Sequence, residues 1–194
     1  MPPTCAPNGA YLDRLMRRES FQALWPLFAK ATKPAKELTE SFSALVHLRP
    51  HLPKRGPFRV IHIGDGAHAR TAALFAVKTA GDNISVDPLI NAELVDDWRK
   101  RFEVRRFAWR KARIGSVVCE LNALPAMPVF VTLVHAHVDV DAVLEHLRWD
   151  AAFSLACCHP SQQLSRRRVP HAMGEDPSVL SEHRRYEVLL NPGV

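Results

Sequence analysis

The chain has 194 residues, of which 47% are hydrophobic and 24% charged, and this composition excludes a disordered or collagen-like protein. No stretch approaches the roughly 20 uninterrupted apolar residues of a membrane-spanning helix, and the N-terminus lacks the layout of a secretory signal. We therefore expect an intracellular, cytoplasmic protein that is not associated with a membrane. Lys and Arg number 26 against 20 Asp and Glu, which favours polyanionic partners such as nucleic acid.

The N-terminal region has the pattern of helices. Apolar residues recur at helical spacing from about 12 to 31, where Pro26 is expected to kink or divide the helix, and again from 35 to 48. The arginines at 14, 17 and 18 leave an organellar transit peptide as an alternative. The proline-rich stretch 50–57 then marks a boundary. We thus expect a helical extension, residues 1–50, which is open to a protein partner, followed by one domain, residues 51–194.

Beyond that boundary, strand and helix patterns alternate, which predicts an α/β fold: a Rossmann-like, doubly wound, mostly parallel sheet covered by helices. The expected strands are 58–63, 83–86, 103–107, 129–135, 152–157 and 186–190. The expected helices are 69–80, which ends at Gly81, and then 91–100 and 140–147. The stretch 116–121 is assigned neither to a helix nor to a strand. Only one strand is expected after the fifth.

A glycine turn follows the first of these strands. Gly64, Asp65 and Gly66 lie between an apolar strand and an Ala-rich helix, where the backbone can approach a ligand closely. The third glycine of a dinucleotide fingerprint is replaced by Ala69, which disfavours a dehydrogenase. About twenty residues on, Asp87 ends the second strand, where an acid accepts hydrogen bonds from ribose hydroxyls. The alternative is a tight turn with an incidental Asp.

This pair of motifs resembles motifs I and II of the class I S-adenosylmethionine-dependent methyltransferases over residues 58–160. The resemblance implies S-adenosylmethionine as cofactor, bound by Gly64, Asp65, Gly66 and Asp87.

A second stretch resembles a branch of that family that contains a tRNA 2′-O-methyltransferase. The positions that match its LH-x-C-G-x-x-T-D and CCH motifs are His135, Asp141, Cys157, Cys158 and His159. The Cys-Gly and Thr positions of the pattern are occupied instead by His137, Val138 and Val140.

Candidate catalytic residues follow the fourth and fifth strands, whose carboxyl ends form the ligand crevice of open α/β sheets. His159 is the preferred base because its ordinary pKa lies near neutrality, and His135 and Asp139 are the other candidates. An equally good interpretation is that Asp139 is the N-cap of the next helix.

Zinc is an alternative ligand for the histidines and cysteines of this region. Adjacent cysteines point to opposite faces of an extended strand, so Cys157 and Cys158 are better explained as buried structural residues, and we expect no metal. Four cysteines, so unevenly spaced, also argue against a disulfide framework.

The stretch 98–113 interleaves basic and aromatic residues. Such a surface attracts RNA phosphates and stacks on unpaired bases, and we predict RNA contacts from Arg105, Arg106, Arg110 and Lys111. The alternative is that the aromatics belong to the core. Arg166, Arg167 and Arg168 are expected to extend the basic surface.

The leading hypothesis is methyl transfer, with RNA as an acceptor, and the competing one is an inactive methyltransferase-like binding module.

Overall fold

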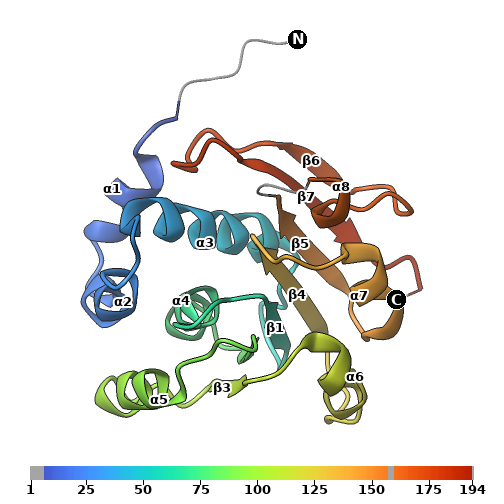
Figure 1. Ribbon diagram of the computed structural model, residues 1–194, viewed down its shortest axis with the longest axis horizontal. Helices are drawn as coiled ribbons and strands as arrows, with labels where there is room; N and C mark the ends of the chain where they lie inside the picture. The colour runs from blue at the N-terminus through green and yellow to red at the C-terminus, as the bar shows by residue number, and fades with distance from the viewer. Residues whose placement is uncertain (1–6, 157–159, 194) are drawn as a thin grey trace.

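The computed structural model describes residues 7–156 and 160–193. Its centre is one seven-stranded sheet with the order β3-β2-β1-β4-β5-β7-β6 (Figure 1). The strands are β1 (Arg59–Ile63), β2 (Asp82–Val86), β3 (Phe107–Arg110), β4 (Val129–Val134), β5 (Ala151–Leu155), β6 (Ala172–Glu175) and β7 (Arg185–Leu190). β1 to β5 run parallel, whereas β7 is antiparallel to both β5 and β6. The predicted α/β class and mostly parallel sheet are confirmed.

Helices cover both faces of this sheet (Figure 1). On one face lie α1 (Ala10–Met16), α2 (Ser20–Phe28), α3 (Pro34–Leu48), α4 (Arg70–Lys78) and α5 (Ala92–Arg101). On the other lie α6 (Ile114–Asn122) and α7 (Val140–His146). A short 3-10 helix, η1 (Arg49–His51), follows α3, and α8 (Pro160–Gln163) follows β5. In the part of the chain that is described, no helix is long and apolar enough to cross a membrane.

Each face has its own hydrophobic core because successive strand residues alternate between the faces. Val60, Phe130 and Phe153 pack with the first set of helices, and Ile61 and Val131 pack with the second. The helices of the N-terminal region belong to the first core, where Leu24, Phe28 and Leu48 are fully buried beside the sheet.

Two expected features of the N-terminal half are wrong in detail. The helix expected at 12–31 is divided at residues 17–19, not at Pro26, which lies inside α2. Pro26 lies in the last turn of α2, where its missing N–H removes one backbone hydrogen bond. Gly81 does not close the helix that precedes it, since α4 ends at Lys78. A Cβ on Gly81 would instead lie 2.2 Å from the Phe58 ring.

The other differences concern short elements. β3 begins at Phe107 rather than 103, because α5 continues to Arg101 and Glu103 then turns with a φ of +51°. The untyped stretch 116–121 lies in α6. The expectation of one strand after β5 is wrong, because β6 precedes β7 and pairs with it. β6 is an edge strand of four residues, Ala-Met-Gly-Glu, with no β-branched residue to reveal it.

Candidate functional site

A pocket of about 290 Å³, the glycine-loop pocket, opens at the carboxyl ends of β1 and β4. From β1 the chain continues to β2 and β3 on one side and then returns to β4 and β5 on the other. The strand order therefore reverses between β1 and β4, and at such a topological switch point open α/β folds bind ligands. The turn after β1 and the start of α4 contribute Gly64, Asp65, Gly66, Arg70 and Thr71. α3 contributes Lys36, Glu37, Glu40 and Ser41, and the end of β4 contributes Val134 and His135.

Gly64 is required by the shape of the pocket floor. Its φ is +68°, and a Cβ built on it would lie 2.7 Å from the Cβ of Ala136 in the loop after β4. Gly66 also has a positive φ, +70°, but open space surrounds it. The two loops therefore touch at Gly64, and the pocket lies beside this contact.

Asp65 caps α4 from the pocket floor. Its carboxylate accepts hydrogen bonds from the backbone N–H groups of Thr71 and Ala72 at 2.8 and 2.9 Å, and from the Ser85 hydroxyl at 3.1 Å. Burial nevertheless outweighs these bonds and raises the pKa of Asp65 to about 6. The positive end of α4 is thus already occupied by a carboxylate of this chain.

Asp87 is joined to the glycine turn directly. One carboxylate oxygen accepts from the Gly66 N–H at 2.9 Å, and the other accepts from the Leu89 N–H at 2.7 Å. Asp87 is buried and is not among the residues that line the glycine-loop pocket, so it adjoins the pocket through the Gly66 N–H. The structure therefore brings together Gly64, Asp65, Gly66 and Asp87 around the glycine turn.

His135 faces α3 across the pocket. Its Nε2 lies 2.7 Å from Oε1 of Glu40, a residue that is buried, and Lys36 lies 3.4 Å from the same oxygen. The residue has a φ of +52°, so it belongs to a turn and not to the strand, which ends at Val134. His135 is in the pocket lining, but its close partner is a residue of the helical extension.

Arg70 links three segments around the pocket. It forms an ion pair with Glu37, donates to the carbonyl of Leu27 at 3.0 Å, and donates to Nδ1 of His68 at 2.8 Å. Burial raises the pKa of Glu37 despite this partner. Glu37, Glu40 and Ser41 were missed by sequence reasoning, although their i, i+3, i+4 spacing puts them on one face of α3.

Asp139 has a structural position. Its side chain accepts from the Ala142 N–H at 3.0 Å, which makes it the N-cap of α7, and it lies 3.4 Å from Arg166. It is not among the residues that line the glycine-loop pocket. Three of the predicted residues, Cys157, Cys158 and the preferred base His159, lie outside the described residues.

The arginine triplet binds the acidic side chains of α7. Arg168 lies 2.7 Å from the buried carboxylate of Asp141, and Arg167 lies 3.3 Å from Glu145. Burial disfavours the charged form of Asp141, but hydrogen bonds from Ser165, the Arg166 N–H and Arg168 outweigh burial and lower its pKa. Asp141 thus holds the segment after β5 against α7.

The stretch 98–113 divides into core and surface. Trp98 and Phe107 are buried, and the Trp98 indole donates to the carbonyl of Ala23 at 2.6 Å. Arg105 and Arg106 are exposed, whereas Arg110 pairs with Glu120 at 2.6 Å. The two buried aromatic rings are therefore not available to stack on bases.

A metal site does not emerge from the described residues, in which no group of three or more His, Cys, Asp or Glu side chains has suitable geometry. His137, one of the histidines considered for zinc, is exposed in the loop after β4.

Comparison with known proteins shows similarity at the level of structure. No protein-family model matches the chain, and no curated protein matches its sequence. A variant of MtNAS in complex with S-adenosylmethionine superposes with a TM-score of 0.55 and 14% identity, over 94% of this chain and 76% of that one. Geranyl diphosphate C-methyltransferase from Streptomyces coelicolor A3(2) gives 0.54 and 12%, over 95% and 98% of the two chains.

A third similar structure is WbdD, a bifunctional kinase-methyltransferase, with a TM-score of 0.52 and 17% identity. The match spans 90% of this chain but only 40% of the WbdD chain. These similarities show that the chain has the Rossmann-like fold found in the three proteins.

Proposed function

We propose that the chain binds S-adenosylmethionine in the glycine-loop pocket and transfers its methyl group. The observation that carries this proposal is the position of Asp65. A dinucleotide places its pyrophosphate at the N-terminus of the helix after the first strand, where unpaired N–H groups meet it. In this chain the carboxylate of Asp65 accepts from those N–H groups, so a ligand phosphate there would meet a like charge.

The charges around the pocket suit a different cofactor. Asp65, Glu37 and Glu40 present carboxylates, while Lys36 and Arg70 present cations, so both signs are within one lining. S-adenosylmethionine carries a sulfonium, an ammonium and a carboxylate but no phosphate. Its amino-acid part would lie among these side chains, and its ribose hydroxyls would donate hydrogen bonds to the Asp87 carboxylate. The bound cofactors of the similar structures agree with this choice.

The residues at the pocket supply alignment more than proton transfer. A sulfonium supplies an activated methyl group and a neutral leaving group, so the protein's main task is to hold donor and acceptor in line. His135 remains a candidate to orient the acceptor because it borders the pocket opposite the glycine turn. His159 remains the predicted base and Asp139 a weaker candidate, although Asp139 already serves α7.

Calorimetric titration with S-adenosylmethionine and, separately, with NAD tests the cofactor. We expect S-adenosylmethionine to bind and NAD to be rejected. Gly66→Val and Asp87→Ala should both weaken binding, the first by placing a branched side chain beside the ligand. Asp139→Ala is the matched control for cofactor affinity, because the Asp139 carboxylate caps α7, whereas Asp87 accepts from the glycine turn. Unchanged affinity in folded Gly66 and Asp87 variants would contradict the proposal.

Transfer of a labelled methyl group to total RNA tests the finer proposal that RNA is the acceptor. The chain's resemblance to the tRNA 2′-O-methyltransferase branch and its exposed Arg105 and Arg106 support that acceptor. Reversing Arg105, Arg106, Arg110 and Lys111 to Glu should abolish RNA retention at low salt. His159→Ala should lower transfer but preserve cofactor affinity. Cofactor binding without transfer to any acceptor would favour the inactive binding module.

A further inference from the structure

A second pocket, the basic pocket, lies between the helical extension and α4, far from the glycine turn along that helix. Its volume is about 480 Å³, within the range of roughly 300–1,000 Å³ typical of small-molecule sites. Its charged lining residues are Arg14, Arg18, Arg49 and Lys78, and no carboxylate lines it. Lys78 is the last residue of α4, whereas the glycine-loop pocket is at the first turn, about 12 Å away by helix rise.

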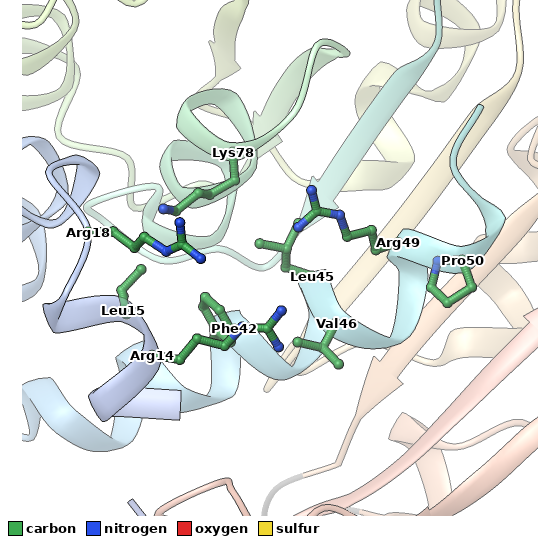
Figure 2. A pocket seen from close by; sticks show the side chains of 9 residues that line it. All are labelled: Arg14, Leu15, Arg18, Phe42, Leu45, Val46, Arg49, Pro50 and Lys78. Atoms are coloured by element: carbon green, nitrogen blue, oxygen red, sulfur yellow. The ribbon is translucent and has the colours of Figure 1, made fainter. Parts of the chain in front are cut away.

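The four cations converge on the same space. Figure 2 shows the guanidinium of Arg18 beside the ammonium of Lys78, with Arg49 across the pocket from them. Burial, followed by the charges of Arg18 and Arg49, lowers the pKa of Lys78. In the described part of the chain, no ion pair with a carboxylate involves any of these four side chains. An adjoining hollow, which Arg14 and Arg18 also line, includes the acidic residue Asp13.

Helix dipoles account for only part of this charge. Arg14 and Lys78 are in the last turns of α1 and α4, and Arg49 follows the end of α3. Each C-terminus carries roughly half an elementary negative charge, so three of them offset about 1.5 of the four positive charges. The remaining positive charge belongs mainly to Arg14, Arg18 and Arg49, which are exposed to solvent, and an anion bound in the pocket would neutralise it.

The rest of the lining is apolar. Phe42, Leu45 and Val46 of α3 form one wall, with Leu15 and Pro50 at its two ends (Figure 2). The Arg14 guanidinium lies 5.9 Å from the Phe42 ring centroid, which holds one cation against this wall. A ligand that contacts both parts needs an anionic head and a neighbouring apolar group.

We propose that the basic pocket binds a small molecule in which a phosphoryl group is attached to an apolar group. The phosphoryl oxygens accept hydrogen bonds from Arg18, Arg49 and Lys78, and the apolar group packs on Phe42, Leu45 and Val46. Arginine suits the head because its fork of N–H donors matches phosphoryl oxygens. The site is independent of the cofactor, so it holds whether or not the chain binds S-adenosylmethionine.

Titration of the full chain with butyl phosphate, inorganic phosphate and butanol tests the proposal. We expect butyl phosphate to bind at least tenfold more tightly than inorganic phosphate, and butanol not to bind. Arg18→Gln combined with Arg49→Gln should weaken butyl phosphate binding at least tenfold. Arg55→Gln is the matched control, since Arg55 is exposed in the loop before β1 and outside the lining.

Two results would overturn the proposal. One is equal affinity for butyl phosphate in the parent and in a folded Arg18, Arg49 double variant, with folding checked by circular dichroism. The other is tighter binding of a short RNA than of any alkyl phosphate, lost in the same double variant, which would assign the pocket to a nucleic-acid surface. If the double variant does not fold, Lys78→Gln alone provides the same comparison, with at least threefold weaker butyl phosphate binding expected.

Discussion

The glycine-loop pocket and the basic pocket are both lined by α3 and α4, but their charged residues are arranged differently. In the first, the charged groups pair with each other: Arg70 with Glu37, and Glu40 with Lys36 and His135. In the second, Arg18, Arg49 and Lys78 face one another without a carboxylate in the lining. The difference indicates that the first pocket is organised in advance for a ligand of mixed charge. In the second, Lys78 donates to the Ser20 hydroxyl, but no lining carboxylate offsets the four cations.

Gly64→Ala should have the largest effect, because its Cβ would collide with Ala136 beside the first pocket, whereas the second pocket is distant from this contact. The positive φ costs about 1–2 kcal/mol for a residue with a Cβ, and the contact with Ala136 adds about 1–3 kcal/mol. We expect urea unfolding to show a loss of about 2–5 kcal/mol. Gly66→Ala is the control, with the same backbone strain and no contact within 4 Å. Equal losses in the two variants would show that the contact with Ala136 is unimportant.

Asp65 should make the first pocket sensitive to pH. Its pKa is raised by burial to about 6, from about 3.8 in an unfolded chain, so its protonated form favours folding. That stabilisation is complete below pH 4 and is lost as pH rises through 6, by up to about 3 kcal/mol. Relative to Asp65→Asn, the parent should therefore lose stability between pH 4 and 7. Denaturant titrations of both proteins across this range measure the loss, and parallel curves would contradict it.

A cationic ligand beside Asp65 should lower that raised pKa and release a proton. At pH 6, the calorimetric enthalpy of S-adenosylmethionine binding should then depend on the ionisation enthalpy of the buffer, and Asp65→Asn should abolish the dependence. Proton uptake on binding would mean that the ligand places negative charge near this carboxylate.

Asp176 fixes the wall that the two pockets share. It accepts from Tyr11 and Ser43, both at 2.6 Å, and His47 Nε2 lies 3.1 Å away. Burial opposes its charge, but bonds from His47, Ser43 and Tyr11 outweigh burial and lower its pKa to about 2. Asp176→Ala should cost about 2–3 kcal/mol because buried donors lose their acceptor. It should weaken ligand binding at both pockets, and a loss confined to one would show that α3 is held independently at the other.

The sequence predicted the pocket floor better than its wall. The strand, glycine turn and helix around Gly64 and Gly66 are a local pattern, and the spacing to Asp87 identifies the next strand. By contrast, the pairing of Glu40 with His135 is a contact between residues 95 positions apart, which depends on how α3 crosses the sheet. The contacts of Arg70 are not predictable from the sequence for the same reason, since Glu37 and Leu27 reach it only in the folded chain.

β6 was missed for a different physical cause. Its four residues include Gly174 and no β-branched side chain, so only its pairing with β7 makes it a strand. The sequence of 98–113 left two interpretations of its aromatic residues, stacking on bases or packing in the core. Burial of Trp98 and Phe107 decides for the core at those two positions, because their environment depends on α2 and on the sheet.

The smallest effect on the free energy of unfolding should come from removing one cationic side chain at each pocket. The sign of this effect should differ between the two pockets. Arg70→Ala removes an ion pair and two further hydrogen bonds, so it should destabilise by about 1–2 kcal/mol. Arg18→Ala removes the repulsion between Arg18 and Lys78, so it should be neutral or stabilise by about 0.5 kcal/mol at low salt. The gain should fade as salt rises, because ions screen exposed charges. Thermal unfolding at low and high salt measures both variants. Destabilisation by Arg18→Ala at low salt would mean that the cations of the basic pocket already have a stabilising partner, and the contrast between the two pockets would fail.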